Sequence, residues 1–421
     1  MKPFERRTTR AGGGANAMHS DVSPMPRRRM LQLLGAGGMA LAMRPVLGVQ
    51  QRAEAARSRP GVLSTRLTQD YGLDFPFVGA GMGFVALPEL VAAVSNAGGL
   101  GVLGNGPEPP PATAVRIDQI QALTDRPFGV DFFLATSPLF GPVTVSDHID
   151  VVIAKDVPLV VFHFDIPPAA WVDRLHSAGI AVWVQVPSVV DALAAVAVGA
   201  DALIAQGAEA GGHNKSTRSL KPLLRDILAA VDVPVLAAGG IVTGADVVEA
   251  LAHRAVGVWV GSRLVASEEA YAHAEYKRRL TEATKRDTVI TKLFGPELPC
   301  LPYRVLRNQV VNEFLDIEDA ICGLPPDFSN PIGTTVLFPG TPFQTETPLP
   351  KFTVLIPTPD TVADMHEMGL AAGKSVHKID RVKPVAQIIE DMMTEARQII
   401  EVELACTRSR GSWGQTRMAL P

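Results

Sequence analysis

Short runs of apolar residues recur along the middle of the chain, and most are separated by stretches with helical periodicity. Runs that are apolar throughout, instead of alternating with polar residues, are typical of parallel strands buried on both faces of a sheet. Eight such runs occur: Phe77–Gly79, Gly99–Leu103, Phe128–Phe133, Leu159–Phe164, Ala181–Val184, Ala202–Ala205, Val235–Ala238 and Val258–Gly261. The sequence therefore predicts eight buried, parallel strands.

Amphipathic stretches between these runs predict the helices that cover the sheet. The clearest are Leu87–Ala97, Pro168–Ala178, Val189–Val198, Leu220–Val231 and Ala245–His253. Strands that alternate with helices form either a closed barrel or an open, doubly wound sheet. Glycine-rich loops follow several strands and not only the first, at Gly79–Gly83, Gly207–Gly212, Gly239–Gly240 and Gly261–Ser262. Because the active-site loops of a barrel come from many strands, this spread favours an α/β TIM (β/α)8 barrel over residues 61–285.

The alternation of predicted strands and helices ends after the barrel. Twelve prolines fall between Pro296 and Pro359 without a regular pattern, so residues 286–360 are predicted to form an irregular, Pro-rich excursion over the barrel. Helical patterns flank it at Glu268–Thr284 and Thr361–Val402, with breaks near Gly369–Gly373 and at Pro384. We expect residues 361–406 to form C-terminal helices that pack on the barrel, and residues 407–421 to form a polar tail.

Residues 1–60 do not continue the barrel pattern and are predicted to be a leader. Arg27, Arg28 and Arg29 precede an apolar run from Met30 to Met43 that is too short to span a bilayer stably. Paired arginines before a modest apolar run resemble a twin-arginine export signal, which would direct the folded protein to the cell envelope. The alternative is a basic, disordered extension with an internal start at Met18 or Met25, and a cytoplasmic protein.

Composition narrows the classes of partner and site. Lys and Arg total 39 against 43 Asp and Glu, a formal net charge of −4, which gives no reason to expect a nucleic-acid partner. A hydrophobic content of 47% is sufficient for a large core. The cysteines Cys300, Cys322 and Cys406 are far apart and lack metal-type spacing. We therefore expect neither a disulfide framework nor a structural zinc site, and no metal ligands.

Two strand ends near the close of the barrel have the pattern of a phosphate site. The run Val235–Ala238 leads directly into Gly239-Gly240, and Val258–Val260 leads into Gly261-Ser262. Paired glycine loops after the seventh and eighth strands bind phosphate in many barrels, because glycine lets the backbone N–H groups approach the oxygens closely. The alternative is that these glycines only close tight turns.

The predicted end of the sixth strand carries three polar side chains on a glycine-rich loop: Gln206, Glu209 and His213. The Gln206 amide both donates and accepts hydrogen bonds, which matches the edge of a heteroaromatic ring. His213 either serves the same site or caps the helix that follows.

His163 lies late in the fourth strand, where a barrel side chain reaches the active face. Its neighbours Phe162 and Phe164 are apolar, and such surroundings favour the neutral imidazole that a general base requires. The alternative is a histidine that only packs in the core.

Several of these motifs occur together in an order that closely resembles nitronate monooxygenases, formerly called 2-nitropropane dioxygenases. The motifs are Ala80-Gly81-Met82-Gly83, Asn96-Ala97-Gly98-Gly99-Leu100-Gly101, Phe162-His163-Phe164, the string from Ala205 to His213, and Ala237-Ala238-Gly239-Gly240-Ile241. The likeness covers about residues 63–405. It implies a barrel that holds FMN non-covalently and oxidises alkyl nitronates, and by extension neutral nitroalkanes, with O2 to a carbonyl compound and nitrite.

The resemblance also implies roles for individual residues. His163 would be the catalytic base. The flavin would be bound by Ala80, Gly81, Met82, Asp131, Gln206 and Gly211 around its ring and side chain, and by Gly240, Trp259, Val260, Gly261 and Ser262 at its phosphate end. His213 would contact either substrate or cofactor.

The chain departs from the family pattern at several of these positions. Gly81 stands where proline is frequent, Asp131 where asparagine is common, and Ser262 where threonine is usual. Asp165 replaces a usual glycine two residues after His163, and side chains two apart on a strand share a face. We therefore expect that Asp165 can orient His163, and that Asp131 adds negative charge near the flavin.

Two other functions fit the same motifs. One is an NAD(P)H-dependent FMN reductase, such as a flavin-type enoyl-acyl-carrier-protein reductase, which shares the Glu209–His213 string. The other is a non-redox barrel that binds a phosphorylated ligand. The Phe162-His163-Phe164 string favours the monooxygenase, because removing a proton from carbon requires a base and hydride transfer does not.

Overall fold

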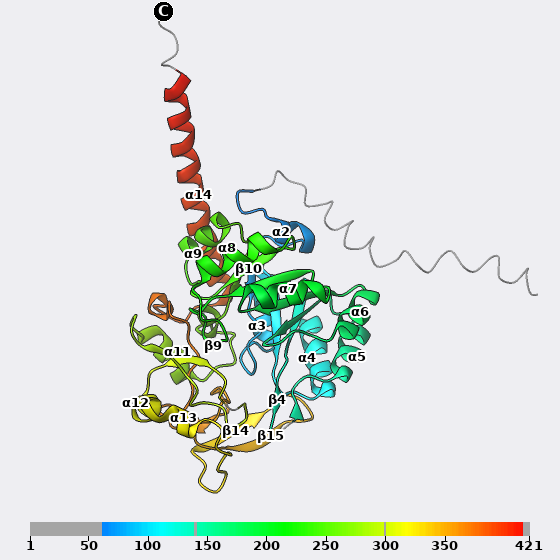
Figure 1. Ribbon diagram of the computed structural model, residues 1–421, viewed down its shortest axis with the longest axis vertical. Helices are drawn as coiled ribbons and strands as arrows, with labels where there is room; N and C mark the ends of the chain where they lie inside the picture. The colour runs from blue at the N-terminus through cyan, green and yellow to red at the C-terminus, as the bar shows by residue number, and fades with distance from the viewer. Residues whose placement is uncertain (1–60, 139–140, 299, 416–421) are drawn as a thin grey trace, which may run out of the picture. The chain divides into compact units, whose positions relative to one another are not determined.

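The computed structural model describes residues 61–138, 141–298 and 300–415, with side chains up to residue 406 (Figure 1). Within these ranges, eight parallel strands form one sheet in the order β1-β11-β10-β8-β7-β6-β3-β2. A parallel bridge between Val78 of β1 and Leu100, directly before β2, joins the two outer strands. The sheet therefore closes into a barrel, and the predicted TIM (β/α)8 fold is confirmed.

Each predicted apolar run contains or overlaps one barrel strand. The strands are β1 (Phe77–Gly79), β2 (Gly101–Asn105), β3 (Phe128–Phe133), β6 (Leu159–His163), β7 (Ala181–Val186), β8 (Ala202–Gln206), β10 (Val235–Ala238) and β11 (Val258–Val260). Side chains such as Val78, Val161, Trp183 and Leu236 fill the barrel interior, while alternate residues pack outward against the helices. Burial on both faces explains why the runs are apolar throughout.

Helices surround the barrel in the alternating order that the sequence predicts (Figure 1). They are α3 (Pro88–Asn96), α4 (Pro110–Leu123), α5 (Ser146–Ala154), α6 (Ala169–Ser177), α7 (Val189–Ala197), α8 (Leu220–Ala230), α9 (Gly244–Ala252) and the short α10 (Ser262–Val265). The C-terminal helix α14 (Val385–Gln415) packs against α9 and α3 and so completes the ring. A Cβ atom on Gly244 would lie 2.3 Å from the Met392 carbonyl oxygen, so this close contact requires glycine.

A short helix closes the amino-terminal end of the barrel. In α2 (Arg66–Tyr71), the Tyr71 hydroxyl accepts a hydrogen bond from Nε1 of Trp183 at 3.0 Å, and the two rings meet edge to face. The Thr65 hydroxyl that caps α2 also donates to the Val256 carbonyl at 2.6 Å. The opposite end, where the strands terminate, is therefore the end that can admit a ligand.

The Pro-rich excursion has more regular structure than the sequence predicts. It contains β12 (Thr288–Thr291), β13 (Tyr303–Leu306), α12 (Gln309–Phe314), η1 (Leu315–Ile317), α13 (Glu318–Ile321), β14 (Gly333–Leu337) and β15 (Thr345–Leu349). Strand β13 pairs with β9 (Gly212–His213) in antiparallel register, with Tyr303 opposite His213. This pairing ties the excursion to the mouth of the barrel.

The helical predictions on either side of the excursion are partly wrong. The helix predicted at Glu268–Thr284 is shorter, α11 (Ala274–Glu282). Residues 361–384 hold only β16 (Val362–Ala363) and η2 (Val376–Lys378), and continuous helix begins after Pro384. Tertiary packing overrides the local pattern here, because a Cβ on Gly369 would press against the Phe294 ring at 3.1 Å. The helix α14 also continues to Gln415, into the predicted tail.

One expectation about the cysteines is corrected. Cys300 and Cys322 form a disulfide across a separation of 22 residues. It closes the loop that carries β13, α12 and α13. Sequence spacing gave no sign of it, because disulfide partners are set by the fold and not by their distance along the chain.

The predicted leader at residues 1–60 and the end of the predicted tail lie outside the described residues. Among the helices that the structure describes, none is long and apolar enough to cross a membrane.

Replacing Cys300 and Cys322 together by serine is expected to destabilise the excursion by about 3 kcal/mol, the loop-closure effect for a loop of this length. Urea unfolding with and without dithiothreitol measures it. The reductant should shift the wild-type midpoint and leave the double variant unchanged. Equal midpoints for oxidised wild type and double variant would contradict a formed disulfide.

Candidate active site

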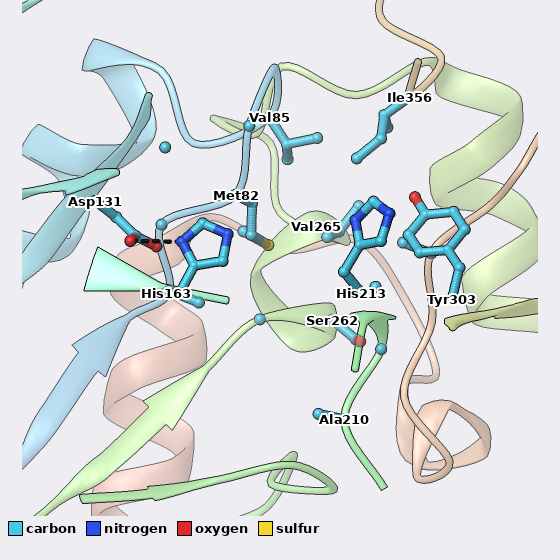
Figure 2. Close-up of a pocket in the computed structure, with 18 of the residues that line it drawn as sticks. Met82, Val85, Asp131, His163, Ala210, His213, Ser262, Val265, Tyr303 and Ile356 are labelled. Carbon is cyan, nitrogen blue, oxygen red and sulfur yellow. Dashed lines mark hydrogen bonds and ion pairs between the residues drawn. The ribbon is translucent and has the colours of Figure 1, made fainter. Parts of the chain in front are cut away.

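A pocket opens at the carboxyl ends of the barrel strands. It is lined by residues from the strand ends, from the excursion and from the segment before α14. Figure 2 shows Met82, Asp131, His163, His213 and Ser262 around it. Of the predicted site residues, only Val260 does not line this pocket. Those that do are Ala80, Gly81, Met82, Asp131, His163, Gln206, Gly211, His213, Gly240, Trp259, Gly261 and Ser262.

Val260 is the exception because of strand alternation. Its neighbour Trp259 belongs to the interior cluster, whereas the Val260 side chain packs in the core between the strands and the helices. The side chain of Val260 therefore does not reach the pocket, so a contact of Val260 with the phosphate would have to come from its backbone.

The two glycine loops predicted to bind phosphate meet a third segment. Gly239 and Gly240 have φ angles of 109° and 77°, in the left-handed region that favours glycine. The Ser262 hydroxyl accepts a hydrogen bond from the Gly373 backbone N–H at 2.9 Å. A Cβ on Gly240 would lie 3.2 Å from the Ser375 hydroxyl oxygen. Backbone from three separate segments thus converges at one end of the pocket, as a phosphate site requires.

The loop after β8 divides its polar residues between the pocket and the scaffold. Nε2 of Gln206 donates to the His213 carbonyl oxygen at 3.2 Å, which holds the loop across the pocket. The Glu209 carboxylate instead accepts from the backbone N–H of Leu220 at 2.9 Å, at the amino terminus of α8. Glu209 therefore stabilises the helix end, where a negative charge is favourable, and His213 does not cap that helix.

His213 is enclosed by aromatic rings. Its ring centroid lies 5.5 Å from Phe133 and 4.7 Å from Tyr303. Burial, assisted by the nearby His163, lowers the pKa of His213 to about 3, so the ring is neutral at physiological pH. Its Nε2 atom is buried and has no hydrogen-bond partner among the described residues. A buried polar atom of this kind is suited to a ligand that offers it a hydrogen bond.

Asp131, not Asp165, orients His163. An Asp131 carboxylate oxygen lies 2.7 Å from Nδ1 of His163, and the side chain of Asp131 is 2% exposed. Burial raises the pKa of the Asp131 carboxyl, and the His163 ring partly offsets this. When Asp131 is ionised it only accepts, so Nδ1 of His163 donates to it, and Nε2 is the ring nitrogen left to exchange a proton with a ligand. In Figure 2 the second ring nitrogen faces away from Asp131, on the side of Met82 and His213.

The expectation that Asp165 orients His163 is wrong. Phe164 has φ of 81°, so the strand ends there and the alternation on which that expectation depended stops. The Asp165 carboxylate instead accepts a hydrogen bond from the Ile166 backbone N–H at 2.8 Å, and the residue is exposed.

A clamp in the excursion covers the pocket. The buried Glu297 carboxylate accepts hydrogen bonds from the Thr353 hydroxyl at 2.6 Å and from the Val354 backbone N–H at 3.0 Å. Burial raises the pKa of Glu297, while these hydrogen bonds offset it. The clamp joins two segments, and Leu298 and Ile356 beside it line the pocket.

Sequence reasoning missed several pocket residues. Asn105 and Gln185 lie at or near the ends of β2 and β7, and a polar residue that follows an apolar run was the signal that could have found them. Tyr303 and Ser375 come from segments without a pattern, and no local signal marks them.

The pocket residues fit a flavin. Glycine backbone at one end suits a phosphate, while apolar and aromatic side chains beside the unpaired Nε2 atom of His213 suit a ring system. His163 faces the same space.

Comparison with known proteins agrees with this site. A family model described as nitronate monooxygenase matches residues 64–395. A probable nitronate monooxygenase of Staphylococcus saprophyticus is 32% identical over 302 residues, which cover 62% of this chain and 84% of that protein.

Two solved structures share the fold over most of the chain. FabK from Thermotoga maritima is 30% identical, with a TM-score of 0.65, and the match covers 81% of this chain and 99% of that one. A nitroalkane oxidase from Streptomyces ansochromogenes is 27% identical, with a TM-score of 0.65, over 80% of this chain and 99% of that one. With the match to the family model over most of its length, the chain belongs to the nitronate monooxygenase family and is a flavin-dependent oxidoreductase.

Proposed function

We propose that the protein oxidises alkyl nitronates, and the nitroalkanes from which they form, with O2 to a carbonyl compound and nitrite, using FMN and with His163 as general base. The observation that carries this proposal is the Asp131–His163 hydrogen bond of 2.7 Å, in the same pocket as the glycine loops. It leaves Nε2 of His163 to receive a proton beside the proposed flavin site.

The chain offers a distinct set of groups to each part of FMN. Backbone at Gly240 and Gly261, with the Ser262 hydroxyl, would hold the phosphate. Ala80, Gly81 and Met82 on one loop, and Gln206 and Gly211 on another, would line the ring and its side chain. When bound, FMN supplies the redox chemistry between the nitro compound and O2.

The protein side chains bind and orient the nitro compound. His163 would take the proton from the carbon next to the nitro group, or orient a nitronate that arrives already formed. The apolar residues Leu298 and Ile356, held in place by the Glu297 clamp, would shield the reacting atoms from water.

The reductase alternative uses the same fold but makes no use of a base. Hydride transfer from NAD(P)H does not require His163, whereas proton removal from carbon does. The Asp131–His163 pair therefore supports nitro-compound oxidation over flavin reduction. A non-redox barrel would contain no flavin at all, and the absorbance of the purified protein separates it from both.

We also propose that the protein is exported to the cell envelope through its twin-arginine leader. The Cys300–Cys322 disulfide supports this, because disulfides form and persist in oxidising compartments and are rare in the cytosol. Replacement of Arg27, Arg28 and Arg29 by lysine is expected to retain the protein in the cytoplasm with both thiols reduced. Cell fractionation and thiol labelling measure this, and unchanged fractionation would reject the leader in favour of an internal start.

The first prediction for the site concerns cofactor binding. The variant Gly240→Ala places a methyl group at φ of 77° inside the pocket and is expected to weaken FMN binding by about tenfold, about 1.4 kcal/mol. Gly179→Ala is the matched control, because Gly179 has φ of 76° and open space around it away from the pocket. Flavin titration compares them. FMN binding in Gly240→Ala as tight as in Gly179→Ala would contradict a phosphate site at Gly240.

The second prediction concerns the base. His163→Asn is expected to lower nitrite release from a neutral nitroalkane by about 10²–10⁴-fold, the usual contribution of a general base. Flavin content should be unchanged. Rapid flavin bleaching by NADH without a nitro compound would instead identify the reductase, whereas nitrite release that His163→Asn leaves intact would reject His163 as the base.

A further inference from the structure

Asp131 on β3 packs against a glycine in the loop that follows β1. A Cβ atom on Gly81 would lie 2.3 Å from the Asp131 Cβ and 2.5 Å from its Oδ2 atom. No real Cβ atom approaches that closely, so any other residue at position 81 would displace Asp131. The two departures from the family pattern, at positions 81 and 131, are therefore in direct contact and form one unit.

The pocket wall carries no permanent positive charge. Among the described residues that line the pocket there is no lysine or arginine. Two acidic residues, Asp131 and Glu297, do line it. His213 is neutral, because burial lowers its pKa to about 3.

Two cationic side chains that stand close in the sequence to pocket-lining residues are engaged with backbone carbonyl groups. Nζ of Lys215 donates to the Phe164 carbonyl oxygen, and the Arg304 guanidinium donates to the Ala208 carbonyl oxygen at 2.9 Å. A substrate that enters as an anion thus finds no fixed cation with which to pair.

The remaining wall is apolar and aromatic. The rings of His163 and Phe133 lie 4.8 Å apart, and Phe133, His213 and Tyr303 continue the row. Val85, Val265 and Ile356 also line the pocket, and Figure 2 shows Val265 beside His213. Such a wall binds an alkyl or aryl substituent by removing its surface from water, at about 0.8 kcal/mol for each buried CH₂ group.

We propose that Asp131, seated against Gly81, is a positioning and specificity-determining residue that makes this site take uncharged, apolar nitroalkanes and convert them to nitronates in place. This inference rests on the proposed function and names its substrate class.

The proposed step conserves atoms and charge. The C–H bond next to the nitro group breaks, its proton passes to Nε2 of His163, and its electron pair moves into the nitro group. The products are a nitronate anion and an imidazolium, formed together in the pocket, and no oxidant takes part. The Nδ1 proton stays hydrogen-bonded to Asp131, whose negative charge stabilises the imidazolium. The cation that pairs with the nitronate is the His163 imidazolium, which forms in the same proton transfer.

The variant Asp131→Asn tests this role. An asparagine amide either donates to Nδ1, which leaves Nε2 protonated, or accepts from it without the negative charge that balances the imidazolium. We expect kcat/KM for neutral 1-nitropropane to fall by about 10²–10⁴-fold. For preformed propyl-1-nitronate, which requires no deprotonation, kcat/KM should stay within about threefold, since no proton transfer is left to lose.

Two further variants guard against a merely structural effect. Gly81→Ala, assayed per bound FMN because Gly81 also lines the proposed flavin site, should lower the ratio of kcat/KM for 1-nitropropane to kcat/KM for propyl-1-nitronate, because it displaces Asp131 without removing it. Asp165→Asn is the matched control, since Asp165 is an exposed carboxylate two residues from His163, and it should change neither value. An equal loss on both substrates in Asp131→Asn would overturn the positioning role.

A substrate series in the wild type tests the selectivity. We expect kcat/KM to rise from nitroethane to 1-nitrohexane, and to be at least about tenfold lower for 3-nitropropanoate, whose carboxylate finds no cation, than for 1-nitrobutane. Equal or better use of 3-nitropropanoate would overturn the inference. Nitrite release from propyl-1-nitronate but from no neutral nitroalkane would overturn it while leaving intact the nitronate oxidation in the proposed function. Release from neither form would reject both.

Discussion

Closure of the parallel sheet is the constraint on which the rest of this structure depends. The bridge between Val78 and Leu100 joins the first two strands, and every barrel strand is then buried on both faces. Polar chemistry can occur only where the strands end, and parallel strands all end on the same side. Asp131, His163 and Gln206, which are far apart in the sequence, meet there because each stands at or near the end of its strand.

The open end of the barrel is completed by a part of the chain that follows it. Strand β13 pairs with β9, so Tyr303 lies beside His213, and the Glu297 clamp fixes the segment that carries Ile356. The segment around Gly373 and Ser375 returns to the phosphate end through the Ser262 hydroxyl. The barrel supplies the base and the glycine loops, and the later chain supplies the aromatic wall and the cover.

The sequence predicts the features that depend on local pattern and leaves out those that depend on contacts between distant segments. Apolar runs predict the barrel, and the glycine loops at its strand ends predict part of the pocket lining. Val260 shows the limit, since the motif includes it but strand alternation turns its side chain away. Strand alternation predicts that Asp165 lies on the same face as His163. The left-handed backbone of Phe164 ends the strand before Asp165, so this prediction fails. Tyr303 and the Cys300–Cys322 disulfide follow only from tertiary structure.

The site handles its two anions, the cofactor phosphate and the nitronate, in different ways. At the strand ends, glycine backbone offers N–H groups to a phosphate without placing a cationic side chain in the pocket. At the base, Asp131 supplies a fixed negative charge, so the positive charge that complements a nitronate arises on His163 only after proton transfer. A wall without lysine or arginine then favours an uncharged substrate at entry and stabilises its anion afterwards. Because the described residues of the wall include no fixed cation, the wall binds a nitronate from solution weakly. A nitronate formed inside the pocket is stabilised by the imidazolium that forms with it.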